Sequence, residues 1–237
     1  LPLLSTFSIF VLHSGNWNFV STHTKYCKMA LNILLIIVAY LLGSIPSAVW
    51  IGKHFYGIDV REHGSHNAGA TNTLRVLGKK AALAVFAIDI LKGFVAVMLA
   101  HFSNYASGSD ALFNFKIALV AAAVIGHIFP IFAGFRGGKG VATLAGAVAG
   151  VYPPAVGLCL LVFIIVLMLT HYVSLSSMTA GIAFPIFIIF LFGERSTSLV
   201  IFSCVIAVLL LITHRKNIGR LIHHTESKTY LGKRKPE

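Results

Sequence analysis

The sequence predicts an all-α integral membrane protein. Hydrophobic residues make up 57% of the 237-residue chain, and only 11% of the residues are charged, whereas soluble domains carry about 25% charged residues. The apolar residues also gather in runs close to the roughly 17–25 residues that a helix needs to span a bilayer. Little polar sequence is left between these runs, so we expect one helical bundle in the lipid bilayer and no soluble domain.

Six apolar runs are long enough to be transmembrane helices, and a further one is short. We expect spans near 30–52, 81–102, 116–135, 155–171, 177–193 and 197–213. The stretch 140–152 is brief for a span, but its alanines and glycines suit close packing against neighbouring helices. This stretch is therefore either a short seventh helix or a re-entrant segment.

The basic residues favour the seven-helix arrangement. The chain has 19 Lys and Arg against 7 Asp and Glu, and the positive-inside rule explains this excess without a nucleic-acid partner. Most of the basic residues lie in the 53–80 loop, in the turn at 136–139 and after residue 213. Seven crossings place all three regions on one side, which would be cytoplasmic, with the N-terminus outside and the C-terminus inside. Six crossings would separate the tail from the other two.

The chain is expected to have three parts. Met29 directly precedes the first strongly apolar run, so we interpret residues 1–28 as a non-native or upstream extension. Residues 29–220 would form the transmembrane domain, and residues 221–237 a basic cytoplasmic tail. The three cysteines show no paired spacing, so neither a disulfide framework nor a metal site is expected.

A glycine-rich basic turn, Gly137-Gly138-Lys139-Gly140, joins two apolar runs. Glycines allow the backbone to bend so that its N–H groups converge, which creates a concavity for an anion. Lys139 adds a positive charge, and a helix that begins after the turn would direct its N-terminus to the same place. The turn therefore predicts an anion site at the edge of the membrane.

The 53–80 loop contains a second candidate anion site. The segment 64–72 is rich in hydroxyl, amide and glycine residues, and Arg75 follows three residues later. Such donors beside a guanidinium can surround a phosphate. A solvated polar turn is the alternative, but the glycine-rich turn expected on the same face favours phosphate binding. The residues proposed from this segment are Ser65, Asn67, Gly69, Thr71 and Asn72.

Four shorter patterns are less specific. Gly43 to Ser47 could be kink and packing residues or could open the helix toward a substrate groove. Asp89 and Lys92 lie three residues apart within a span, which favours a structural ion pair over a catalytic dyad. His214 to Asn217 is either a basic stop signal or part of a site, and Tyr172 to Ser177 forms a short turn on the same face.

Together these blocks resemble the PlsY family, the bacterial acyl-phosphate-dependent glycerol-3-phosphate acyltransferases. The resemblance runs from about Met29 to Arg220, and several blocks in the same order make it specific. His66 and Ala68 depart from the usual family residues, and Arg136 replaces a common lysine. The matching blocks are 43–53, 61–80, 89–93, 126–143, 172–177 and 214–218.

The resemblance implies transfer of a fatty acyl group from acyl phosphate to the 1-hydroxyl of glycerol 3-phosphate, with lysophosphatidic acid and inorganic phosphate as products. It also implies a seven-helix protein of the bacterial inner membrane, with its site at the cytoplasmic face. We expect it to act as a monomer without metal or cofactor. The expected catalytic residues are Lys139, Arg75, Ser65, His214 and Asn217. The expected substrate-binding residues are Asn67, Gly69, Thr71, Asn72, Gly137, Gly138, Gly140 and Ser177.

The residues also bear on mechanism. Asp59, Glu62 and Asp89 are the acids nearest the motifs, and none is an obvious general base. No serine has a convincing His–Asp pair to activate it. We therefore expect direct transfer in which the phosphate of the donor accepts the proton, without an acyl-enzyme. A phosphate transporter and a lipid-binding scaffold are the alternatives, but the motifs cluster on one face and no internal repeat is evident.

Overall fold

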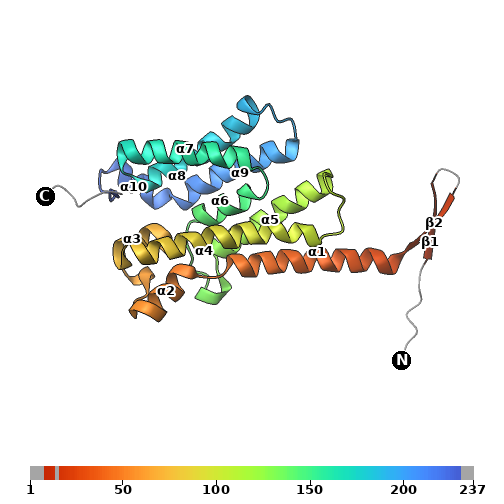
Figure 1. Ribbon diagram of the computed structural model, residues 1–237, viewed down its shortest axis with the longest axis horizontal. Helices are drawn as coiled ribbons and strands as arrows, with labels where there is room; N and C mark the ends of the chain where they lie inside the picture. The colour runs from red at the N-terminus through yellow and green to blue at the C-terminus, as the bar shows by residue number, and fades with distance from the viewer. Residues whose placement is uncertain (1–7, 14–15, 231–237) are drawn as a thin grey trace.

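The structure, a computed structural model, describes residues 8–13 and 16–230 and is helical apart from one short hairpin (Figure 1). The hairpin pairs β1 (Ser8–His13) with β2 (Asn16–Ser21) in antiparallel register and leads into α1 (Thr22–Gly43). The first helix therefore begins earlier than the expected residue 30. Of the proposed extension and tail, residues 1–7, 14–15 and 231–237 lie outside the described part of the chain.

The expected span 30–52 is wrong in its second half. The helix α1 ends at Gly43, and a separate helix, α2 (Ser47–Tyr56), follows after a break. Pro46 explains the break, because proline has no N–H to donate and disfavours helical backbone at the preceding residue. At the break, the carbonyl of Ile45 accepts hydrogen bonds from the Ser47 N–H at 3.0 Å and from Lys92 Nζ at 2.8 Å.

One layer of the bundle consists of α1, α4 and α5, which pack on one another. A short helix η1 (Val60–Glu62) and α3 (Ala70–Leu77) lead from α2 to α4 (Lys79–Met98), which ends in η2 (Leu99–Phe102). The next helix, α5 (Asp110–Ile128), is followed by η3 (Ile131–Ala133). Buried alanines and Leu119 fill the contact between α1 and α5.

The second layer consists of α7, α8 and α9, and α6 lies between the two layers (Figure 1). The helix α6 (Val141–Ala149) packs mainly on α4 and is followed by α7 (Pro153–Thr170) and α8 (Val173–Ile186). Pro185 near the end of α8 precedes a π-helical turn, η4 (Phe187–Leu191). The chain closes with α9 (Thr197–Thr213) and α10 (Arg215–Ile222).

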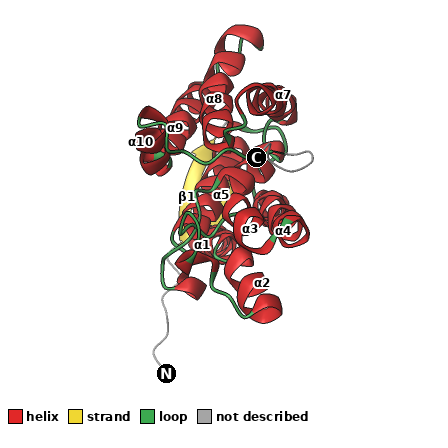
Figure 2. Cartoon of the chain, turned by 90° about the vertical axis from the view of Figure 1, so that its left-hand side faces the viewer, coloured by secondary structure: helices red, strands yellow, loops and turns green. Residues whose placement is uncertain are grey.

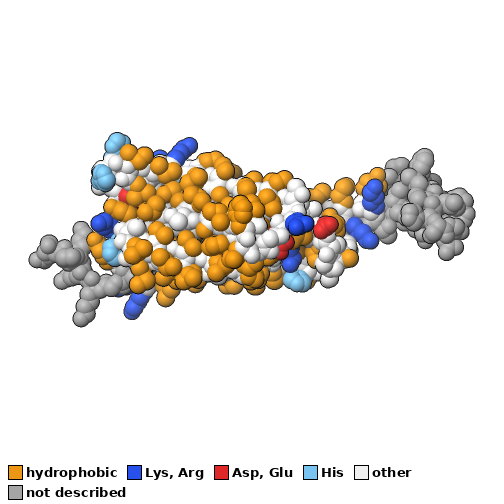
Figure 3. Space-filling view, turned by 90° about the horizontal axis from the view of Figure 1, so that it is seen from above, with side chains coloured by type: hydrophobic (Ala, Val, Ile, Leu, Met, Phe, Trp, Pro, Cys, Tyr) orange, Lys and Arg blue, Asp and Glu red, His pale blue; other side chains and the backbone are white. Residues whose placement is uncertain are grey.

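Among the residues that the structure describes, five helical segments are long and apolar enough to cross a membrane. The helices α9 and α10 meet at a bend of 61°, and the pair is a sixth candidate if it is counted as one span. Nine residues long, α6 is short for a span. The face seen in Figure 3 is hydrophobic along most of its length, with charged side chains toward the two ends of the helical part. The five segments are Lys25–Gly43, Lys79–Phe102, Asp110–Ala133, Pro153–Thr170 and Val173–Leu191.

The short helices α2, α3 and α10 lie at one end of the bundle, the end that faces the reader in Figure 2. These helices belong to the basic regions that the sequence placed on one side. The loop between η2 and α5 lies at the opposite end (Figure 1).

Candidate active site

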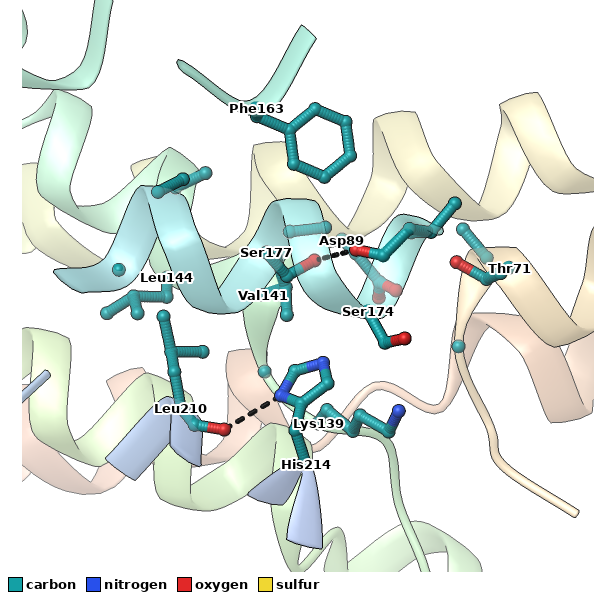
Figure 4. Close-up of a pocket in the computed structure, with 18 of the residues that line it drawn as sticks. Thr71, Asp89, Lys139, Val141, Leu144, Phe163, Ser174, Ser177, Leu210 and His214 are labelled. Carbon is teal, nitrogen blue, oxygen red and sulfur yellow. Dashed lines mark hydrogen bonds between the residues drawn. The ribbon is translucent and has the colours of Figure 1, made fainter. Parts of the chain in front are cut away.

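A cavity of about 430 Å3 lies between the two layers, and all five expected catalytic residues line it. Its walls come mainly from α3, α4, α6, α7, α8 and α9, with single residues from α5 and α10, so both layers form the site. Polar and charged side chains line one end, and apolar side chains line the rest. Figure 4 shows part of this arrangement, with Lys139 and His214 beside each other below Ser174 and Thr71.

Lys139 lies in the turn between η3 and α6, and its ammonium group donates a hydrogen bond to Asn217 Oδ1. The turn bends sharply because Gly140 has a φ of 83°, a conformation that favours glycine. Burial lowers the pKa of Lys139 to about 8, although the nearby carboxylate of Glu226 opposes this shift. Lys139 therefore lies in the cavity as a cation that loses its proton more readily than an exposed lysine.

The four residues of the glycine-rich turn do not share one role. Gly140 lines the cavity with Lys139, whereas Gly137 and Gly138 lie behind it and line a second, smaller cavity. The N–H of Gly137 donates to the carbonyl of Ile128 at 3.1 Å, and that of Gly138 donates to the carbonyl of His127 at 3.2 Å. These two amides are therefore already paired. A Cβ atom at either glycine would overlap His127, so glycine at these two positions allows the turn to pack closely against α5.

The segment 64–72 reaches the cavity through all five of its expected residues. Ser65, Asn67, Gly69 and Thr71 line the polar end, as does Asn72. Asn72 is 1% exposed and holds the loop together, because it accepts from the Ser65 N–H at 2.8 Å and donates to the Val60 carbonyl at 2.7 Å. Its side-chain amide thus shapes the loop that presents the other donors.

Arg75 extends from α3 to the same end of the cavity. Its guanidinium donates to the carbonyl of Ser227 at 3.3 Å. Burial lowers the pKa of Arg75, and the charge of Glu226 opposes the shift. Arg75 and Lys139 therefore provide two cations at one end of the cavity, one from α3 and the other from the turn before α6.

His214 and Asn217 enter the cavity from the junction of α9 and α10, and both are buried. The Nδ1 atom of His214 lies 2.8 Å from the carbonyl of Leu210, as drawn in Figure 4. A carbonyl accepts hydrogen bonds, so Nδ1 carries the proton and Nε2 remains the acceptor. Ser177 also lines the cavity, and its hydroxyl donates to the carbonyl of Val173 at 2.8 Å.

Sequence reasoning missed Glu226, a buried acid in the tail. Its carboxylate accepts hydrogen bonds from Ser174 at 2.9 Å, Asn217 at 2.7 Å and Arg220 at 2.6 Å. Burial tends to raise the pKa of Glu226, but these hydrogen bonds outweigh it and the pKa is lowered. The chain after α10 thus returns to the cavity. The signal in the sequence was an isolated acid within a basic tail.

The expected ion pair within α4 is confirmed. Asp89 and Lys92 are both buried, and Lys92 Nζ lies 2.8 Å from Asp89 Oδ1. Asp89 lines the cavity, and so does His127 from α5, which the sequence analysis did not single out. Charged residues within a bilayer are expected to pair in this way.

The apolar part of the cavity extends from the polar end along α6. Small residues of α6 form one wall, while larger apolar side chains of α4 and α7 form others. Such a cavity can hold an anionic group among the cations and an attached hydrocarbon chain beyond it. The apolar lining includes Phe86, Ile90, Ala145, Ala149, Leu160 and Phe163. Among the described residues, no group of three His, Cys, Asp or Glu side chains could hold a metal ion.

Comparison with known proteins gives one consistent result. The family model for glycerol-3-phosphate acyltransferase matches residues 33–224. A glycerol-3-phosphate acyltransferase of Bacillus cytotoxicus is 46% identical over 87% of this chain and 99% of its own. One of Fusobacterium nucleatum is 42% identical over 81% of this chain and 95% of its own.

Solved structures give the same result. The chain is similar to the crystal structure of PlsY, an integral membrane glycerol 3-phosphate acyltransferase, in its glycerol 3-phosphate form. The TM-score is 0.75 at 38% identity, covering 84% of this chain and 96% of the other. The lysophosphatidic acid form of PlsY gives a TM-score of 0.72 at 36% identity, covering 84% and 95%.

Proposed function

The chain belongs to the glycerol-3-phosphate acyltransferase family, and we propose that it transfers a fatty acyl group from acyl phosphate to the 1-hydroxyl of glycerol 3-phosphate. It is an acyltransferase of phospholipid synthesis, and its product is lysophosphatidic acid. The main support for the proposal is the two-part cavity, in which Lys139 and Arg75 lie at the polar end and apolar side chains line the rest. Both substrates carry a phosphate, and the donor also carries a hydrocarbon chain.

Within this proposal, Lys139 and Arg75 bind the substrate phosphates, and the hydroxyls of Ser65 and Thr71 complete their hydrogen bonds. The acyl chain lies along the small residues of α6. Lys139 also stabilises the negative charge that develops on the carbonyl oxygen during attack, which is effective in a site that excludes water. His214 and Asn217 orient the acceptor hydroxyl.

The proton of the attacking hydroxyl passes to the donor. Glu226 already accepts three hydrogen bonds and its pKa is lowered, so it is a weak base. Asp89 is held in an ion pair with Lys92. As the new C–O bond forms, the bond between the acyl carbon and the phosphate oxygen breaks, and inorganic phosphate leaves with the proton. Ser177 donates to its own helix, which argues against an acyl-enzyme on this residue.

We further propose that the chain crosses the inner membrane seven times, with the site at the cytoplasmic face. The arrangement of α2, α3 and α10 at one end supports this topology, because an odd number of crossings separates the N-terminus from the tail. The helix α6 would be the short crossing. We also propose that the protein is active as a monomer.

The test is a phosphate-release assay on purified protein in detergent or lipid. The protein receives palmitoyl phosphate and glycerol 3-phosphate, with palmitoyl-CoA as a parallel donor. We expect phosphate release that requires both substrates and equals the lysophosphatidic acid formed. Transfer from palmitoyl-CoA alone would refute the acyl-phosphate donor, and a trapped acyl-enzyme on Ser65 or Ser177 would refute direct transfer.

A further inference from the structure

A cluster of buried polar side chains lies directly behind the turn that carries Lys139. It joins four segments of the chain, namely the start of α2 and the helices α4, α5 and α6. We call it the buried cluster, and all its members are buried. Its members are Ser47, Asp89, Lys92, His127 and Thr143.

The α4 side of the buried cluster is anchored by charge. Asp89 Oδ1 accepts a hydrogen bond of 2.7 Å from Ser47 Oγ and lies 2.8 Å from Lys92 Nζ. Lys92 also donates to the carbonyl of Ile45 at 2.8 Å. Buried charges that are paired and hydrogen-bonded in this way have well-defined positions, because breaking the pair would leave an uncompensated charge.

His127 links this anchor to the glycine-rich turn. Its Nδ1 atom lies 3.0 Å from Thr143 Oγ1 and 3.7 Å from Asp89 Oδ1. Its carbonyl accepts the hydrogen bond from the Gly138 N–H at 3.2 Å. A Cβ atom at Gly138 would overlap the Nε2 atom of the ring, so the ring lies against the turn itself. His127 therefore contacts the chain on both sides of Lys139, at Gly138 before it and at Thr143 after it.

The turn has little room to move toward the buried cluster. The space behind it is a cavity of about 10 Å3, lined by Lys92, His127, Gly137 and Gly138 among others. This volume is about that of one water-sized probe. On its other side, Lys139 is directed to Asn217 across the catalytic cavity. The backbone of the turn is thus held close to α5, and the ammonium group is directed away from it.

We propose that His127 is a positioning residue, which holds the glycine-rich turn through Gly138 and Thr143 so that Lys139 faces the substrate phosphate. The proposal rests on the proposed role of Lys139 in that site. Loss of the contact would let the turn shift, and a displacement of about 1 Å at a catalytic group can cost about 100-fold in rate. Lys139 would also become more hydrated, since its burial depends on the same turn.

Two variants test the proposal. Thr143→Val removes the hydroxyl that contacts His127 while keeping the shape of the side chain, and His127→Gln removes the ring. We expect both to raise the KM for glycerol 3-phosphate about 10-fold or more. This is less than the roughly 100-fold cost of a full 1 Å displacement, because each variant removes only part of the contact. Thr179→Val and His101→Gln are the matched controls. The Thr179 hydroxyl donates to the Leu175 carbonyl of its own helix, and His101 is exposed in η2. Both controls should retain the KM of the unaltered protein.

A second measurement does not require activity. The rate at which an amine-reactive reagent labels Lys139 is followed by mass spectrometry as a function of pH. In the unaltered protein the rate should rise with a midpoint of about 8. The charged groups nearest Lys139, namely Glu226, Arg220 and Arg75, are unchanged in both variants, so a looser turn should raise the midpoint by restoring hydration.

The two measurements separate the possible failures. Unchanged KM and unchanged labelling in folded Thr143→Val would overturn the positioning role, even if His127→Gln fails to fold. A labelling midpoint that moves in Thr143→Val, together with full activity of Lys139→Met, would instead support the positioning role and overturn the catalytic role of Lys139.

Discussion

At the scale of single residues, the site depends on side chains that the sequence keeps far apart. Lys139 and its partner Asn217 are 78 positions apart, and Ser174 and Glu226 are 52 positions apart. Lys139 lies just before α6 and Asn217 in α10, while Ser174 lies in α8 and Glu226 follows α10. Because the polar end is made of such pairs, removal of one member leaves the other buried without its partner, and the effects of substitutions in the site should not be additive.

Lys139→Ala is expected to lower kcat/KM for glycerol 3-phosphate at least about 100-fold, because it removes a cation from the phosphate and from the developing oxyanion. Lys139→Arg keeps the charge but not the shape of the ammonium group, so it should retain more activity than alanine. Steady-state kinetics on purified protein measure both. Substantial turnover by folded Lys139→Ala would show that the cation is not needed.

Activity should fall as the pH rises through about 8. Burial lowers the pKa of Lys139 to about 8, so the ammonium form that attracts phosphate is present below this pH and is lost above it. The effect should appear in kcat/KM, which reports the free enzyme. Bound phosphate favours the cation, so the fall in kcat should lie at a higher pH. In Lys139→Arg the fall near pH 8 should disappear, and its persistence would assign the titration to another group.

The chemistry of the site could be predicted from residue types, but the partners of each residue could not. Lysine and arginine near glycine-rich turns indicate phosphate whatever their exact contacts. Whether the N–H of Gly137 faces a ligand or the carbonyl of Ile128 depends on how the turn packs on α5, which local sequence does not specify. Glu226 was missed for a related reason, because its burial depends on the tail folding back over α8 and α10.

At the scale of helices, apolar run length predicted where most of the long helices lie, and side-chain size explains how they fit. The expected span 30–52 failed because hydrophobicity alone does not show where Pro46 ends a helix. Small residues were more informative. Gly146 of α6 lies against the backbone of Ile90, and Gly93 of α4 lies against that of Thr143. The two glycines thus allow α4 and α6 to approach closely, which the alanine and glycine content of 140–152 had indicated.

Gly146→Ala should destabilise the folded protein by about 1–3 kcal/mol, the usual cost of overpacking a core. A Cβ atom at this position would overlap the carbonyl oxygen of Ile90. Gly157→Ala on α7 is the matched control, because no described heavy atom lies within 4 Å of its Cβ position. Alanine is the better helix former, so this variant should be as stable as the unaltered protein or more so. Thermal unfolding in detergent compares the two, and equal stability would contradict the close contact.

At the scale of the whole molecule, the two layers contribute different residues to the site. The layer of α1, α4 and α5 supplies Asp89, Lys92 and His127 of the buried cluster, and the turn with Lys139 is hydrogen-bonded to the end of α5. The layer of α7, α8 and α9 supplies Ser174 and Ser177, and His214 directly follows α9. The cavity lies between the layers, so neither can form the site alone. The polar end of the cavity lies at the same end of the bundle as α3 and α10 (Figure 1). A seven-crossing topology therefore predicts that glycerol 3-phosphate, which is water-soluble, enters from the cytoplasmic side.

Single-cysteine labelling in spheroplasts tests this topology. The background replaces Cys27, Cys159 and Cys204, and cysteine is introduced at one of three exposed positions, Glu62, Ser107 or His223. A membrane-impermeant maleimide should label Ser107→Cys at once, because the loop between η2 and α5 would face outward. Glu62→Cys and His223→Cys should react only after the membrane is permeabilised. Labelling of His223→Cys but not Glu62→Cys in sealed spheroplasts would place the tail on the outside, and α6 would then be a re-entrant segment rather than a crossing.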